Sequence, residues 1–193
     1  MRKNAIVVGL MSSLVMPISA MADTAGKSYI GFDYGSASYT GVTVPAGTYP
    51  NPGLASFTWG YRVNEMLAAE VGYTKFGDSS LTISGVGKGT VSASSIHVAV
   101  VGSYPLNQQF SLIGKAGLAS SNNSLNVEIV GGTNSTSSAQ QADLMYGLGA
   151  QFNVSQQVAL RAQYESFGSF GNLGNTGTAM KATAITFGAI YNF

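Results

Sequence analysis

The chain lacks cysteine, has few charged residues and contains no long apolar run after its first residues. Without cysteine it has neither a disulfide framework nor a thiolate metal site. Charged residues make up 9% of the sequence, whereas an ordinary soluble domain has roughly 25%. The net charge of +1 does not imply a polyanionic partner such as nucleic acid. No segment beyond the N-terminus approaches the ~18 to 20 apolar residues of a membrane helix, which argues against a helical membrane protein.

Glycine and aromatic residues are abundant instead, and they are arranged with a period of two. The sequence holds 25 Gly, 10 Tyr and 9 Phe. Helical periodicity is absent, and apolar residues alternate with small or polar ones, which is typical of strands that have two different faces. We predict eight strands, at residues 28–38, 54–63, 67–77, 91–104, 109–120, 140–153, 157–168 and 179–193.

The N-terminus has the features of a cleavable signal peptide. Arg2 and Lys3 form a basic start, and residues 5–15 form a short apolar stretch. The segment Ala20-Met21-Ala22 fits the small-x-small rule for cleavage. An N-terminal membrane anchor is the alternative, but the apolar stretch is too short to span a bilayer. We therefore predict a signal peptide at 1–22 and one exported domain at 23–193.

The connections between the predicted strands alternate strictly between short and long. Three short ones lie around residues 64–65, 105–108 and 153–156, and four longer ones lie at 39–53, 78–90, 121–139 and 169–178. Strict alternation places all short turns at one end of a barrel, as in outer-membrane proteins with periplasmic turns and extracellular loops. The predicted fold is an all-β, eight-stranded antiparallel up-and-down transmembrane β-barrel in the outer membrane of a Gram-negative cell.

Periodicity alone does not decide which face is outside, because a lipocalin-like soluble barrel would turn its apolar face inward around a ligand. In the second strand Phe57, Trp59 and Tyr61 alternate with Thr58 and Gly60. The polar set is too rich in glycine and charge to line an apolar cavity, and aromatic residues on the apolar set cluster near strand ends like interfacial girdles. Lipid on the apolar face is therefore the favoured arrangement.

The segment YRVNEMLAAEVGYTKFG at 61–77 resembles the second hairpin of the OmpA-like and opacity-type family of small outer-membrane β-barrels. Similar patterns are GKAG at 114–117, YGLG at 146–149 and LRAQYE at 160–165. The resemblance implies that Tyr191 and Phe193 belong to the C-terminal signal read by the outer-membrane assembly machinery. It covers nearly all of the exported chain. It implies fold and location rather than function, since the family includes adhesins, serum-resistance proteins, small pores and structural barrels.

Charged residues on the predicted inward face form a candidate lumen network. An eight-stranded barrel has an interior that side chains can just fill, so opposite charges there should pair and plug it. A gated or leaky narrow pore is the alternative use of the same residues. The pattern does not decide which carboxylate pairs with which cation. The predicted members are Asp33, Arg62, Glu70, His97, Lys115, Arg161 and Glu165.

Enzyme chemistry has little support in the sequence. His97 is the only histidine, and the residue two positions later, where lipid A deacylase barrels carry a serine, is Ala99. Ser95 lies two positions before His97, and both are predicted to face the lumen, away from lipid. A lipid-modifying hydrolase would need a nucleophile, a base and an orienting acid within reach. The carboxylates Glu70 and Glu165 are better explained by pairing with cations. No metal-ligand spacing is present, so we predict a protein without cofactor, metal or catalytic residues.

Three lysines near the predicted loop end, Lys75, Lys88 and Lys181, are candidate contacts for lipopolysaccharide phosphates, or are simply solvated. The loops carry too few basic residues for a heparin or nucleic-acid binder. We predict a non-enzymatic barrel that contributes to envelope structure and surface interaction through its four loops. A narrow porin-like channel is the alternative, and a lipid A-modifying enzyme is a third hypothesis.

Overall fold

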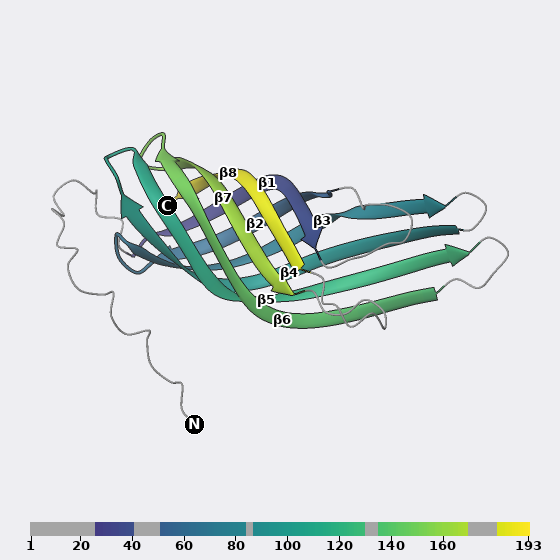
Figure 1. The fold of residues 1–193 in the computed structure, drawn as a ribbon. Coiled ribbons are helices and arrows are strands. Elements are labelled where there is room, and N and C mark those ends of the chain that lie inside the picture. Colours follow the sequence, from purple (N-terminus) through teal and green to yellow (C-terminus); the bar gives the residue numbers. More distant parts are fainter. Residues whose placement is uncertain (1–25, 41–50, 84–86, 130–134, 170–180) are drawn as a thin grey trace, which may run out of the picture.

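The computed structural model describes residues 26–40, 51–83, 87–129, 135–169 and 181–193, which form one closed antiparallel barrel (Figure 1). Each strand pairs with its neighbours in sequence, and the last pairs with the first, which confirms the predicted fold class. Among the described residues no helix is long and apolar enough to cross a membrane. The strands are β1 (Ser28–Thr40), β2 (Gly53–Arg62), β3 (Leu67–Ile83), β4 (Gly87–Pro105), β5 (Phe110–Ile129), β6 (Ser135–Asn153), β7 (Val158–Ser169) and β8 (Lys181–Asn192).

The predicted alternation gives the wall its two faces. Phe57, Trp59 and Leu148 point outward and are 54%, 46% and 73% exposed, whereas Thr58 and Thr186 point inward and are buried. Successive side chains of a strand point to opposite faces, so one apolar set covers the whole outer wall. A soluble barrel would bury that set, so the exposed apolar wall is the arrangement expected in lipid.

The three short turns share one local structure. In each, the second residue is Asn64, Asn107 or Ser155, and its side chain accepts hydrogen bonds from the backbone N–H groups two and three positions later, at 2.7 to 3.2 Å. The residue before it donates its backbone N–H to the carbonyl four positions later, at 2.8 to 2.9 Å. Asn and Ser suit this place because their short polar side chains can bond nearby backbone groups. These turns define the turn end of the barrel.

The two terminal strands close the wall at this same end. β1 and β8 pair from Tyr29↔Asn192 to Thr40↔Lys181. The backbone N–H of Phe193 donates to the carbonyl of Ser28 at 3.0 Å, so the last residue of the chain completes the ladder. Tyr191 and Phe193 are exposed, with ring centroids 5.6 Å apart. The C-terminal pair thus lies on the outer wall at the turn end.

The four central strands are longer than we predicted. We expected loops at 78–90 and 121–139, but β3 runs to Ile83, β4 begins at Gly87, and β5 and β6 pair as far as Val127↔Ser135. We had interpreted Ser, Thr and Asn as loop residues. They form strand here because each central hairpin supplies backbone partners for both of its strands, which outweighs weak side-chain propensity. Figure 1 shows the two hairpins extending beyond the rest of the barrel.

Several predictions concern segments outside the described residues. These are the signal peptide at 1–22, most of the loop at 39–53 and most of the loop at 169–178.

Candidate functional site

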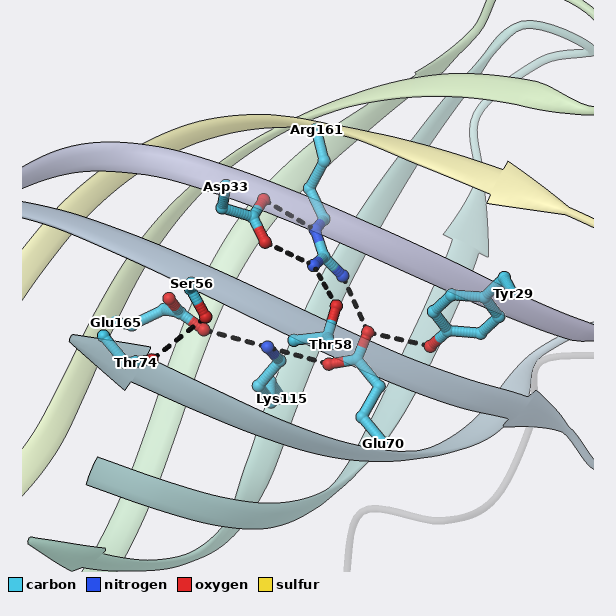
Figure 2. Close-up of polar contacts among 9 residues, drawn as sticks. All are labelled: Tyr29, Asp33, Ser56, Thr58, Glu70, Thr74, Lys115, Arg161 and Glu165. Atoms are coloured by element: carbon cyan, nitrogen blue, oxygen red, sulfur yellow. Dashed lines mark hydrogen bonds and ion pairs between the residues drawn. The ribbon is translucent and has the colours of Figure 1, made fainter. Parts of the chain in front are cut away.

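The middle of the lumen contains five charged side chains from four strands. Asp33 comes from β1, Glu70 from β3, Lys115 from β5, and Arg161 and Glu165 from β7. All five are at least 94% buried, and we call this set the ionic layer. It combines three carboxylates with two cations, and Figure 2 shows them converging from opposite walls.

Glu70 is the centre of the ionic layer because it contacts both cations. Its Oε1 accepts a hydrogen bond from Arg161 Nη1 at 2.7 Å, and its Oε2 lies 2.8 Å from Lys115 Nζ (Figure 2). The hydroxyl of Tyr29 donates to Oε1 at 2.8 Å. A carboxylate with three such partners recovers much of the hydration that it loses on burial.

Each of the other two carboxylates pairs with one cation. Asp33 receives two hydrogen bonds from Arg161, from Nε at 3.3 Å and from Nη2 at 2.8 Å. Glu165 accepts one from Lys115 Nζ at 2.9 Å. The planar guanidinium can therefore bridge Asp33 and Glu70, which a point charge such as lysine does less precisely. Arg161 Nη2 also lies 3.3 Å from Thr58 Oγ1.

Lumen glycines make room for these long side chains. A Cβ at Gly188 would collide with the Asp33 carboxylate and with the carbonyl oxygen of Phe32. A Cβ at Gly60 would collide with the ring of Tyr29. The glycine-rich character of the inward face, visible in the sequence, thus has a packing cause: Gly188 and Gly60 are the cross-strand partners of Asp33 and Tyr29, and in a narrow barrel these side chains have room only because the adjacent position is bare.

Two apolar layers lie on either side of the ionic layer, and the sequence analysis did not identify them. The loop-end apolar layer contains Ala37, Leu54, Phe76, Ala93, Ala119, Met145, Phe167, Ala182 and Ala184. The turn-end apolar layer contains Tyr29, Ala68, Val101, Ile113, Ala159 and Ile190. The signal was present, because Leu54, Phe76, Met145 and Phe167 share the inward register of their predicted strands. We missed it by treating the apolar residues of each strand as one outward set.

His97 lies between the ionic layer and the loop-end apolar layer. It is 1% exposed, its ring centroid is 6.3 Å from that of Phe167, and Phe167 packs edge-on against Phe76 at 5.3 Å. Neither ring nitrogen has a hydrogen-bond partner among the described residues. Ser95, the next lumen-facing residue of β4, bonds to Ser121 at 3.1 Å. His97 therefore faces the lumen, as predicted, but forms no ion pair with the other predicted members.

Arg62 was predicted with the lumen charges, but it lies apart from the ionic layer. It is only partly buried, its guanidinium stacks 5.1 Å from the ring centroid of Tyr29, and its Nη2 donates to Asn192 Oδ1 at 3.2 Å. The position is at the turn end of β2, where Nε is buried without a hydrogen-bond partner among the described residues.

The three candidate lysines are exposed and belong to β3, β4 and β8. Lys75 pairs in register with Ser94, and Lys88 lies six residues away on the same strand as Ser94. At about 3.3 Å per residue this separates the two lysines by roughly 20 Å along the wall, so they do not form one compact anion site.

Comparisons with known proteins agree with this geometry. The model of the outer membrane protein β-barrel domain family matches residues 8–193. Ail of Yersinia pestis, solved with the heparin analogue sucrose octasulfate, is 21% identical with a TM-score of 0.61, covering 88% of this chain and 99% of Ail. Neisserial surface protein A is 20% identical with a TM-score of 0.63, covering 86% and 97%. OprG of Pseudomonas aeruginosa is 13% identical with a TM-score of 0.61, covering 88% and 97%. No curated protein sequence matches the chain.

Proposed function

The chain belongs to the outer membrane protein β-barrel domain family, and from that premise we propose that it is a non-enzymatic surface-interaction protein of the outer membrane. Its barrel serves as an anchor, and its loop-end hairpins contact partners outside the cell. The observation that carries the proposal is a contrast between the filled interior of the barrel and the strands that project beyond its loop end. The interior is filled by three side-chain layers, whereas four strands continue past the wall as a sheet.

The length of that sheet follows from the register. β3 pairs with β2 only as far as Leu54↔Phe76, but with β4 as far as Ile83↔Gly87. β6 pairs with β7 only from Tyr146↔Ser166, yet with β5 from Val127↔Ser135. At about 3.3 Å per residue, β3 runs roughly 23 Å beyond its last register pair with β2, and β6 runs roughly 36 Å beyond its last register pair with β7. Strands of this length present far more surface than a turn needed only for chain reversal.

The chemistry of the projecting sheet indicates the kind of partner. Its exposed residues are mainly uncharged hydrogen-bonding groups, including Asn122, Asn126, Ser138 and Gln140. Ail was solved with a heparin analogue, but the described part of these hairpins exposes one lysine, Lys88, beyond the wall. A polyanion would need a basic patch. We therefore propose a partner recognised through hydrogen bonds, such as a neutral glycan or a polar protein surface.

The decisive experiment shortens both hairpins. Cells of a Gram-negative strain would display the natural chain or a variant with residues 79–91 and 124–138 each replaced by Asn-Gly, and adhesion to host-cell monolayers would be measured. A matched control replaces the turn residues 64–66, at the opposite end, by the equivalent residues 107–109. We expect the shortened variant to lose adhesion while its heat-modifiable gel shift shows a folded barrel. Equal adhesion by both variants, or large steady conductance of the natural protein in planar bilayers, would refute the proposal.

We also propose how the chain reaches and sits in its membrane. Residues 1–22 act as a signal peptide, and Tyr191 and Phe193 are read by the outer-membrane assembly machinery. Their exposed position at the closing seam supports the second role. Lys75, Lys88 and Lys181 contact lipopolysaccharide phosphates, since all three are exposed near the loop end. Lys88 does so at a separate place, because it lies roughly 20 Å along the wall from Lys75.

A further inference from the structure

His97 occupies a place in the lumen that the anchoring role does not require. This side chain is almost fully buried between a layer of charges and a pair of phenylalanine rings. Two other lumen-facing atoms, Gln163 Nε2 and Thr186 Oγ1, also have no partner among the described residues, and their residues are adjacent across the β7–β8 ladder.

We propose that His97 is a proton-binding site whose occupancy opens the loop-end apolar layer of the lumen. Phe76 and Phe167 are the aromatic lid of that layer, and the ring of His97 lies next to Phe167, at 6.3 Å between centroids. The inference does not rest on the proposed partner of the hairpins. It concerns the interior of the barrel and would hold for a barrel with any surface ligand.

The closed lumen favours the neutral imidazole. An imidazolium beside the lid would be out of water with no hydrogen-bond acceptor on either nitrogen among the described residues. A proton on His97 therefore disfavours the closed arrangement.

The charged groups facing His97 do not offset this cost. Lys115 on β5, Glu70 on β3, Arg161 on β7 and Asp33 on β1 all act on it electrostatically, two as cations and two as carboxylates. Both carboxylates are already hydrogen-bonded to Arg161. The third, Glu165 on β7, is bonded to Lys115. No carboxylate oxygen is hydrogen-bonded to either His97 nitrogen among the described residues, so a proton on His97 gains an acceptor only if water enters past the lid or the ionic layer rearranges.

The physical consequence is a pH-dependent equilibrium of the lid. A hydrated imidazole ionises near pH 6.5. If the open form binds one more proton than the closed form, the ratio of open to closed barrels rises by up to about tenfold per pH unit below that value. Hydrophobic constrictions of this kind gate by wetting and dewetting, and a charge placed directly beneath one favours the wet state.

Two absences in the sequence make the test specific. The chain has no cysteine and only one histidine. Thr186→Cys therefore introduces a single thiol at a fully buried lumen position, and the imidazole resonances of a tag-free protein belong to His97. The rate of T186C modification by a membrane-impermeant methanethiosulfonate would be measured in nanodiscs from pH 7.5 to 5. Dividing it by the rate of Asn122→Cys, an exposed site on β5, removes the pH dependence of thiol reactivity.

We expect this ratio to rise at least tenfold between pH 7.5 and pH 5, with the same midpoint as the His97 resonances. In His97→Gln the ratio should change less than twofold, whereas Ser95→Ala, a neighbouring lumen change, should keep the rise. Phe167→Ala should raise the ratio at pH 7.5 and flatten its pH dependence, which tests the lid without altering His97. An unchanged rise in H97Q would assign the opening to the carboxylates and overturn the proposal. The proposal would also be overturned if the ratio stayed flat while His97 titrates, or if His97 did not titrate at all. A thiol that remained protected in F167A would overturn it as well.

Discussion

Replacing Lys115 by methionine tests how the ionic layer is held together. Lys115 Nζ contacts Glu165 at 2.9 Å and Glu70 at 2.8 Å, and all three side chains are at most 4% exposed. Removing one partner of a buried pair costs about 3 to 5 kcal/mol, because the remaining charge is left without compensation in a medium of low polarity. Methionine keeps most of the volume of lysine, so the loss reflects charge rather than a cavity.

Two companion substitutions reveal which carboxylate depends on Lys115. Glu165 is hydrogen-bonded to Lys115, whereas Glu70 also has Arg161 and Tyr29 as partners. Lys115→Met with Glu165→Gln should therefore recover about 2 to 3 kcal/mol, a large coupling for neighbouring groups. Lys115→Met with Glu70→Gln should recover less than ~1 kcal/mol, because E70Q itself deprives Arg161 of a charge. Both double variants leave the same net charge, so each is the matched control of the other.

The free energy of unfolding would be measured by urea titration in lipid vesicles. Trp59 is the single tryptophan and lies on the outer wall, so its fluorescence reports loss of the lipid environment. Equal recovery by the two double variants would mean that net charge, not the observed pairing, sets stability. A cost below about 1 kcal/mol for K115M alone would show that the layer is hydrated rather than buried.

Three further substitutions test the wall, the packing of the lumen and the turns, each by the same unfolding assay. Leu148→Arg on the outer wall should cost about 2 to 4 kcal/mol, whereas Leu106→Arg at the turn end should cost about 0 to 1; equal costs would contradict the assigned depth. Gly188→Ala should cost about 1 to 3 kcal/mol by overpacking against Asp33 and Phe32. An equal cost for Gly102→Ala, whose Cβ would meet only the Gly114 carbonyl oxygen at 3.9 Å, would contradict the packing explanation. Asn107→Ala should cost about 1 to 2 kcal/mol because it removes two hydrogen bonds to the turn backbone, and Gln108→Ala in the same turn should be nearly neutral.

The alternation of side chains was enough to predict the barrel, its strand count and its outward face. Those features depend on local chemistry: a period of two marks a strand, and the short connections fix its neighbours. The same reasoning failed for 78–90 and 121–139, where Ser, Thr and Asn suggested loops. Whether such residues form strand depends on a partner strand supplied by the same hairpin, and composition does not report that partner.

The period of two predicted which charged residues enter the lumen, because register within a strand assigns every second side chain to the interior, but it did not predict the apolar residues that share this face. It determined that Asp33, Glu70, Lys115, Arg161 and Glu165 share that space. Three features became visible only in the folded barrel: Glu70 bridges both cations, Arg62 lies apart on Tyr29, and His97 lies next to Phe167 with neither nitrogen bonded within the described residues. The physical reason is that contacts across a barrel join strands far apart in sequence. Their heights are set by strand tilt and stagger around the closed wall, which no local pattern encodes.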